Sequence, residues 1–146
     1  MSDTVNGRCL CGSVTFQFSG RPHWTVYCHC ETCRRATSSP VTTWISVPRK
    51  ALRFIKGAPR HFSSSPGVTR GFCEVCGTPL SYENERIPDE IHLYAVSLDS
   101  AVGVTPNRHV FTSEQLPWFD VTDQLPRYAT TSRGGAKPSS VGPRKP

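Results

Sequence analysis

Residues 27–35 read YCHCETCRR, with three cysteines in six positions, a histidine between two of them and two arginines behind. These cysteines could form a metal site, a disulfide cluster or a group of reactive thiols. The first residues lack the apolar run of a signal peptide, and no apolar stretch approaches membrane-spanning length, so we expect a soluble cytoplasmic protein. Seven cysteines in a reducing compartment are poor candidates for structural disulfides, and an odd number cannot all pair within the chain. Metal ligation is therefore the better interpretation.

The composition predicts one loop-rich domain with a basic tail. At 146 residues, with 13 prolines and 11 glycines, the chain fits one domain of many short elements. The net charge of +6 comes mostly from residues 127–146, which contain five basic residues and no acidic one. From about residue 130 the chain lacks bulky apolar residues except Val141, which predicts a folded domain over residues 1–129 and a flexible basic tail over 130–146. Nucleic-acid binding is disfavoured, because the body is nearly neutral and the tail is expected to be solvated.

Periodicity in the body predicts β-structure. Residues 13–18 alternate polar and apolar, with Val14, Phe16 and Phe18 on one face. Further β-rich runs are residues 24–28, 41–47, 52–55 and 91–98, with shorter ones around RHF, VTRGF and PLSY. The one expected helical turn covers residues 31–37, inside the opening motif. We therefore expect a mainly β domain.

The four outer cysteines predict a closed metal site. Cys9 and Cys11 form one pair and Cys73 and Cys76 the other, and each pair ends in Cys-Gly. Glycine allows the positive φ that turns backbone N–H groups toward the sulfurs of such a loop, here called a knuckle. Two knuckles supply the four thiolates of a structural zinc site. The alternative of a redox Cys-x-x-Cys pair is disfavoured, because the chain lacks the βαβ context of that chemistry.

The three inner cysteines predict an open metal site. In an extended segment residues i and i+2 share one side, so Cys28 and Cys30 converge while His29 faces away. With a helical turn from Glu31, Cys33 returns beside Cys30. Three thiolates then face one point and no fourth ligand is offered locally, which is typical of a catalytic rather than a structural zinc.

Two alternatives remain open for this partition. A distant residue, such as His61, His92, His109 or an aspartate, could complete a second structural site. The ligands could also be shared differently among the three cysteine groups. The histidines other than His29 are isolated in the sequence and are expected to be ordinary surface or core residues.

An open zinc with three thiolates is suited to binding a thiol. Its formal charge of about −1 makes it a weaker Lewis acid than a zinc bound by three neutral histidines. A soft vacant position favours a fourth sulfur instead. Arg34 and Arg35 could offset the charge of the site or of an anionic thiol, although both could equally be solvated surface residues.

Four stretches together resemble one family: RCLCGSV, CHCETCRRATSSPVTTW, GFCEVCGTPLSY and PNRHVFTSEQLPWFDVTDQLPRY. Their order over residues 5–128 is similar to that of the glutathione-dependent formaldehyde-activating enzyme family, which includes centromere protein V. The resemblance implies an Mss4-like fold of packed antiparallel β-sheets with two zinc ions. It implies a structural zinc on Cys9, Cys11, Cys73 and Cys76, and a catalytic zinc on Cys28, Cys30 and Cys33. Ser38 departs from the family, which commonly has glycine there.

The resemblance also implies a reaction. The family's named activity, a carbon–sulfur lyase reaction, adds glutathione to formaldehyde to give S-(hydroxymethyl)glutathione, with the thiol entering the open zinc position. His29, Arg34 and Arg35 could support this chemistry. Two other functions remain possible from the sequence: a thiol carrier or sensor that accelerates nothing, and a zinc-stabilised binding module whose basic tail attracts nucleic acid.

Overall fold

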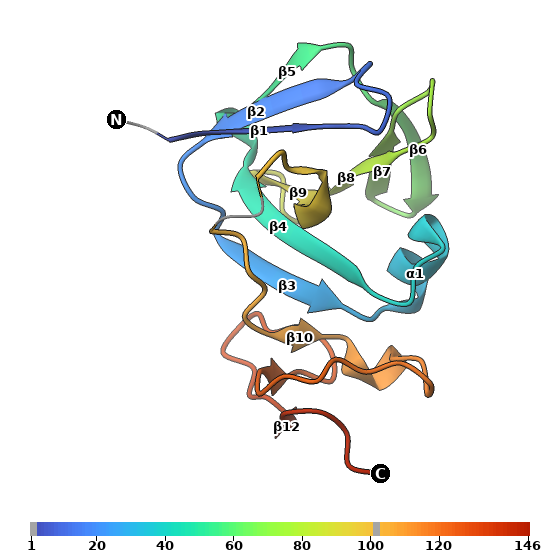
Figure 1. Cartoon of the computed structure of the whole chain (residues 1–146), viewed down its shortest axis with the longest axis vertical. Helices are drawn as coiled ribbons and strands as arrows, with labels where there is room; N and C mark the ends of the chain where they lie inside the picture. Colours follow the sequence, from blue (N-terminus) through green and yellow to red (C-terminus); the bar gives the residue numbers. More distant parts are fainter. Residues whose placement is uncertain (1–2, 101–102) are drawn as a thin grey trace. The chain divides into compact units, whose positions relative to one another are not determined.

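A computed structural model describes residues 3–100 and 103–146, which form two compact units. The first unit comprises the described residues up to 24 and from 44 to 104, and the second comprises residues 25–43 and 105–146. The structure is mainly β with one short α-helix, as the sequence predicts (Figure 1). Among the described residues, no helix is long and apolar enough to cross a membrane.

The first unit is built from antiparallel strands in two groups. One group has the order β1-β2-β5 and the other runs β4-β9-β8-β7-β6. The strands are β1 (Thr4–Arg8), β2 (Thr15–Ser19), β4 (Thr42–Pro48), β5 (Leu52–Lys56), β6 (Arg60–Ser65), β7 (Val68–Phe72), β8 (Pro79–Asn84) and β9 (Glu90–Tyr94), with 3-10 turns at Arg49–Ala51 and Ala95–Ser97. The strand expected over residues 91–98 therefore ends earlier, because the chain turns after Tyr94.

Alternating apolar residues of these strands form the core of the first unit. Phe16 and Phe18 of β2 are buried, as the alternation predicts. On the facing strands, Ile45 of β4 is paired in register with Leu93 of β9, and both are fully buried. The core cluster also contains Cys9 and Cys73, so the proposed structural metal site borders the core.

The second unit combines short strands with the helix. Its elements are β3 (Trp24–Cys28), α1 (Glu31–Thr37), β10 (His109–Val110), a 3-10 turn (Thr112–Glu114), β11 (Pro126–Arg127) and β12 (Ser140–Val141). β10 pairs in parallel with β3 and with β11, whereas β12 pairs antiparallel with β11. The second unit therefore adds two parallel pairings to the antiparallel sheets that the resemblance implies.

The end of the chain is not the structureless tail that its composition predicts. Ser140 and Val141 form β12, and the N–H of Ser139 donates to the Arg127 carbonyl at 2.7 Å. The backbone N–H of Arg144 donates to Asp120 Oδ2 at 2.7 Å. These contacts are made by backbone groups and the Asp120 carboxylate rather than by apolar side chains, which is why the composition does not reveal them.

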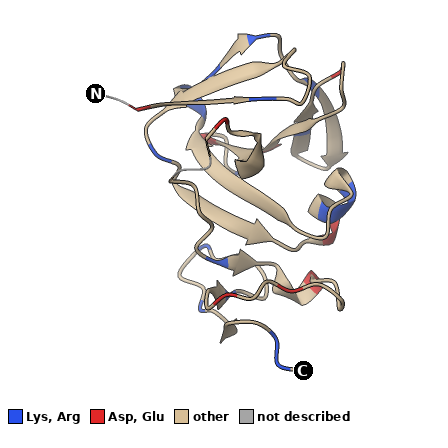
Figure 2. Ribbon diagram, in the orientation of Figure 1, with Lys and Arg blue, Asp and Glu red and all other residues tan. Residues whose placement is uncertain are grey.

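Basic and acidic residues are dispersed over many elements rather than confined to one strand or helix (Figure 2).

Candidate metal centres

The four outer cysteines lie on two loops of closely similar geometry. Cys9 follows β1, and its carbonyl accepts the N–H of Gly12 at 3.2 Å. Cys73 follows β7, and its carbonyl accepts the N–H of Gly77 at 2.8 Å. Gly12 and Gly77 have the same φ of 77°, in the left-handed region that favours glycine. The prediction of two knuckles ending in glycine is confirmed.

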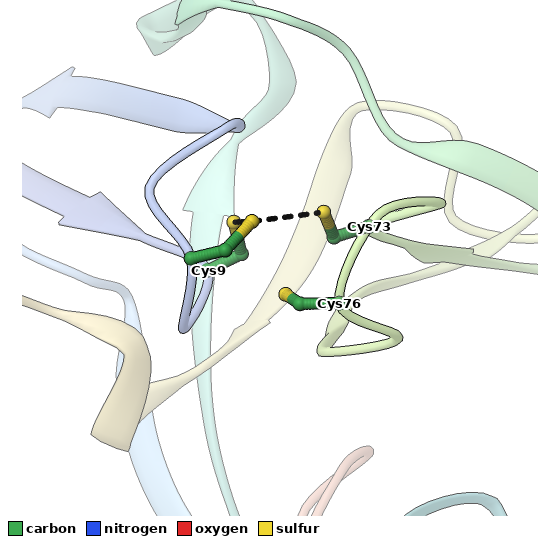
Figure 3. A group of neighbouring side chains, drawn as sticks. Cys9, Cys73 and Cys76 are labelled. Carbon is green, nitrogen blue, oxygen red and sulfur yellow. Dashed lines mark hydrogen bonds between the residues drawn. The ribbon is translucent and has the colours of Figure 1, made fainter.

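The two knuckles present their sulfurs to a common point (Figure 3). The four sulfurs lie within 4.8 Å of one another, with Cys9 and Cys11 sulfurs 3.6 Å apart and Cys11 and Cys73 sulfurs 3.9 Å apart. A tetrahedral zinc with Zn–S bonds of about 2.3 Å separates its sulfurs by about 3.8 Å. These distances fit four-coordinate zinc.

Thr78 connects the two knuckles, and sequence reasoning did not identify it. Its hydroxyl accepts the N–H of Leu10 at 3.1 Å and lies 3.1 Å from the Cys76 sulfur. The Thr78 hydroxyl and N–H lower the pKa of Cys76 to about 5. The backbone N–H of Cys76 favours the Cys73 thiolate, but burial and the neighbouring sulfurs raise the pKa of Cys73 to about 11. A group of close sulfurs, of which those of Cys9 and Cys73 belong to buried residues, cannot all ionise without a counter-charge and is suited to hold a cation.

The three inner cysteines lie where β3 passes into α1. Cys28 ends β3, Cys30 is the N-cap of α1, and Cys33 lies in its first turn, where its N–H donates to the Cys30 sulfur at 3.4 Å. The three sulfurs lie within 4.8 Å of one another. Helix α1 covers the predicted residues, Glu31–Thr37. The prediction that Cys28, Cys30 and Cys33 converge is therefore matched by the structure.

No fourth ligand joins this group among residues 3–100 and 103–146. The metal-ligating side chains within reach of one another are only the three cysteines, so none of the histidines or aspartates considered as completing ligands belongs to the group. The neighbouring Cys30 and Cys33 thiols, followed by burial, raise the pKa of Cys28 well above its ordinary value. Three crowded sulfurs fit a soft cation with an open coordination position.

His29 points away from the sulfurs, as expected, into a buried hydrogen-bonded chain. Its Nε2 lies 2.8 Å from His109 Nδ1, and His109 Nε2 lies 2.8 Å from Asp123 Oδ2. His29 and His109 are both fully buried. Burial, followed by the charge of His109, lowers the pKa of His29 to about 4, and burial also lowers the pKa of His109.

His109 is a satisfied core histidine, which is one of the two states expected of the isolated histidines, but its contact with His29 was not predicted. The residue lies 80 positions from His29 in the sequence, and only the parallel pairing of β10 with β3 brings the two rings together. The one available signal was its place in the late stretch PNRHVFTSEQLPWFDVTDQLPRY, which also contains Asp123.

The two arginines have different contacts. Arg34 donates from Nε to the His29 carbonyl at 3.1 Å and from Nη2 to the Glu114 carbonyl at 2.9 Å. Arg35 pairs with Glu31 at 2.9 Å, and its side chain is exposed. Arg34 therefore braces the backbone beside the cysteines, and Arg35 forms a surface ion pair one helical turn long.

Ser38 ends the helix in a strained conformation. Its φ of 52° and ψ of 38° lie in the left-handed region, and its N–H donates to the Arg34 carbonyl. Glycine is the residue most often found at this helix-terminating position, because it has no Cβ to clash. The glycine that the family resemblance implies at this position would adopt this backbone conformation without strain.

Comparisons with known proteins agree with the residues described above. Residues 4–114 match the family described as glutathione-dependent formaldehyde-activating enzyme. A Halomonas elongata protein, provisionally named a glutathione-dependent formaldehyde-activating enzyme, is 27% identical over 128 residues, covering 80% of each chain. An uncharacterized lyase of Schizosaccharomyces pombe is 32% identical over 84 residues, covering 56% of this chain and 61% of the lyase.

A solved structure supports the fold alone. The crystal structure of a Rhodobacter sphaeroides protein superposes with a TM-score of 0.55 at 21% identity, covering 69% of this chain and 91% of that one. The family match spans well over half of the chain and includes both cysteine groups. The chain belongs to the glutathione-dependent formaldehyde-activating enzyme family, with its Mss4-like, mainly β fold.

Proposed function

We propose that this protein is a zinc-dependent enzyme of the carbon–sulfur lyase class that joins a thiol to a small aldehyde, with glutathione and formaldehyde as the first choice. The observation that carries the proposal is the difference between the two cysteine groups. One has the four ligands of a closed site, and the other has three among the described residues. The family membership and the lyase name of one relative support the same class.

The donor sets specify which residues would hold the two ions. Cys9, Cys11, Cys73 and Cys76 would hold a structural zinc, and Cys28, Cys30 and Cys33 a second zinc. When bound there, the second zinc supplies an open position at which a substrate thiol loses its proton. The gain from ionisation alone is limited to about 2 kcal/mol, because a thiol of pKa about 8.5 is already a few per cent thiolate at pH 7.

The reaction itself is an addition whose atoms balance without a further reactant. The thiol sulfur forms a bond to the carbonyl carbon, the C=O double bond becomes a single bond, and the thiol proton ends on the oxygen. In the reverse direction the C–S bond breaks, and thiol and aldehyde are released. Because ionisation contributes little, most of the acceleration must come from holding the two reactants together.

The protein part of the site is organised for such positioning. The backbone that carries the three sulfurs is held by the Arg34 guanidinium at the His29 carbonyl and by the Cys33 N–H at the Cys30 sulfur. The Glu31 N–H donates to the Glu114 carboxylate at 3.2 Å, which anchors the start of α1. A ligand set that is organised before the substrate arrives reduces the ordering cost of binding.

The test is NMR exchange spectroscopy of glutathione and its hydroxymethyl adduct at equilibrium. We expect the wild type to increase the interconversion rate and Cys33→Ser, at matched protein concentration, to leave it at the rate of buffer alone. Saturable thiol binding with no rate increase would refute the enzyme and favour a thiol carrier or sensor. If the protein neither binds the thiol nor increases the rate, the alternative function of a zinc-stabilised binding module is favoured.

A further inference from the structure

A buried chain of hydrogen bonds leads from Asp123 to the peptide between two of the sulfurs. Asp123 contacts His109, and His109 contacts His29, with both donor–acceptor distances at 2.8 Å. His29 is the residue between Cys28 and Cys30. The rings of His29 and His109 lie nearly parallel, with centroids 5.1 Å apart and an angle of 24° between the planes.

The direction of each hydrogen bond follows from the partners of Asp123. Its Oδ1 accepts from Arg127 Nη1 at 2.7 Å and from the Leu125 N–H at 3.0 Å, so the group is an ionised carboxylate. An ionised carboxylate only accepts, and His109 must therefore carry its proton on Nε2. The neutral ring then accepts at Nδ1, which requires His29 to donate from Nε2.

His29 is fixed at three points, and two of them are in the backbone. Its N–H donates to the Val110 carbonyl at 3.1 Å, and its carbonyl accepts from Arg34. The third point is the ring. Among the described residues, Nδ1 of His29 has no hydrogen-bond partner. The hydrogen bond from Nε2 to His109 is therefore the one that orients the ring.

Ring orientation and backbone direction are linked at this residue. In the extended segment the His29 side chain leaves one side of the backbone, and the two flanking sulfurs leave the other. A rotation of the segment about its axis that loosened the ring would move both sulfurs together. The ring contact therefore adds to the two backbone hydrogen bonds in keeping the Cys28 and Cys30 sulfurs convergent.

We propose that His109 is a positioning residue of the three-cysteine centre: through its hydrogen bond to His29 it holds the Cys28–Cys30 segment in the conformation that binds metal. The proposal rests on the assignment of a metal to these cysteines and is independent of any reaction there. Residues that orient metal ligands from outside the ligand set commonly change metal affinity by 10- to 100-fold when they are substituted. We expect an effect at the lower end, about tenfold, because His109 acts through the backbone.

Two substitutions at one position separate positioning from general stability. In His109→Asn the side-chain oxygen replaces Nδ1, so the bond from His29 is kept and the bond to Asp123 is lost. In His109→Gln the terminal amide replaces Nε2, so the bond to Asp123 is kept and the bond from His29 is lost. Each variant removes one buried hydrogen bond, and the two should lose similar thermal stability.

The readout is 113Cd NMR of the cadmium-substituted protein during titration with EDTA. The two centres give separate lines, and the four-cysteine line serves as an internal control. We expect His109→Gln to release cadmium from the three-cysteine centre at about tenfold lower chelator activity and to shift its line, whereas His109→Asn retains both wild-type properties. Equal losses in the two variants, or no loss in either, would overturn the proposal. If the wild type binds no cadmium at the three-cysteine centre, both the metal assignment and the role of His109 are refuted. If the wild type binds cadmium there but does not change the thiol–aldehyde exchange rate, only the proposed enzymatic function is refuted.

A second measurement applies if both His109 variants fail to fold. In Asp123→Asn the side-chain oxygen remains at the two donors Arg127 and Leu125, so the amide NH2 faces His109 Nε2 and reverses its tautomer. Long-range 1H–15N NMR should then show the proton of His29 moved from Nε2 to Nδ1, although His29 does not touch residue 123. An unchanged His29 tautomer would show that no coupling passes through His109, and the proposal would fall.

Discussion

Substitution of one cysteine should affect folding strongly at the four-cysteine group and weakly at the three-cysteine group. Cys76→Ser removes a proposed ligand from the four-cysteine group, which links the loop after β1 to the loop after β7. Cys33→Ser removes a ligand of the group contained within β3 and α1. We predict that Cys76→Ser fails to fold or aggregates, and that Cys33→Ser yields a folded protein with about one zinc per chain and no thiol binding.

The magnitude follows from the lengths of chain that the two ions close. The proposed outer ion would join Cys11 to Cys73, which are 62 positions apart, whereas the proposed inner ion would join Cys28 to Cys33, which are 5 positions apart. By the logarithmic loop-closure relation, closing the longer loop removes more entropy from the unfolded chain, and the outer ion should therefore stabilise the fold by about 2 kcal/mol more than the inner ion. Cys9 and Cys73 also belong to the buried core of the first unit, so loss of that ion exposes packed apolar surface. Structural zinc contributes about 10 kcal/mol or more, which equals the whole stability of a typical domain.

The assay is elemental analysis of purified wild type and both variants, beside circular dichroism and a thermal melt. Metal-replete, reducing conditions are needed, and we expect two zinc ions per wild-type chain. If Cys33→Ser unfolds as severely as Cys76→Ser, the inner group is a second structural site. If the wild type holds one zinc, the division into four and three ligands is wrong.

Three further substitutions test local features of the two units. Ser38→Gly should raise stability by about 0.5–1 kcal/mol in a thermal melt, because it relieves the left-handed backbone at the end of α1; an unchanged or lower melting temperature would contradict this. Gly71→Ala should lower stability by about 1–3 kcal/mol, because its Cβ would collide with Ser81 Oγ, and adding Ser81→Ala should recover part of the loss. Arg144→Ala should lower stability by about 1 kcal/mol in urea unfolding, because its guanidinium donates to carbonyls of the loop before Asp120. Burial opposes ionisation of Asp120, but the Arg144 N–H and other donors hold the pKa of Asp120 below its ordinary value. The stability that ionised Asp120 contributes to the folded state is therefore present above about pH 4 and should be lost as the pH falls. A urea midpoint that is equal in wild type and Arg144→Ala would refute the role of Arg144.

The local features were the ones that the sequence could predict. The helix over residues 31–37 and the Cys-Gly knuckles depend on neighbours within a few positions, and residue type and spacing therefore specify them. The burial of Phe16 and Phe18 follows from simple alternation. The same rules failed for β1, where Asn6 and Gly7 interrupt the apolar pattern although the strand pairs fully with β2.

The features that escaped prediction are long-range and polar. β10, β11 and β12 have two residues each, which is too short for a periodic pattern. The bond between His29 and His109 joins residues far apart in the sequence, and no spacing rule connects them. The contacts near Arg144 are made by charge and backbone groups, whereas the composition indicates disorder from missing apolar bulk.

The second unit is built from two segments of the chain, residues 25–43 and 105–146, and this has a consequence for protein synthesis. All four outer cysteines have been translated once Cys76 is added. The residues proposed to support the inner cysteines come later, at His109 and Asp123, and the contact of Arg144 with Asp120 comes later still. At about 5–20 residues per second, Arg144 follows Cys76 by roughly 3–14 s on the ribosome. During that interval the thiols at Cys28, Cys30 and Cys33 exist without the segment that is proposed to support them. If both groups hold metals as proposed, we expect the nascent chain to bind the outer ion stably before the inner one.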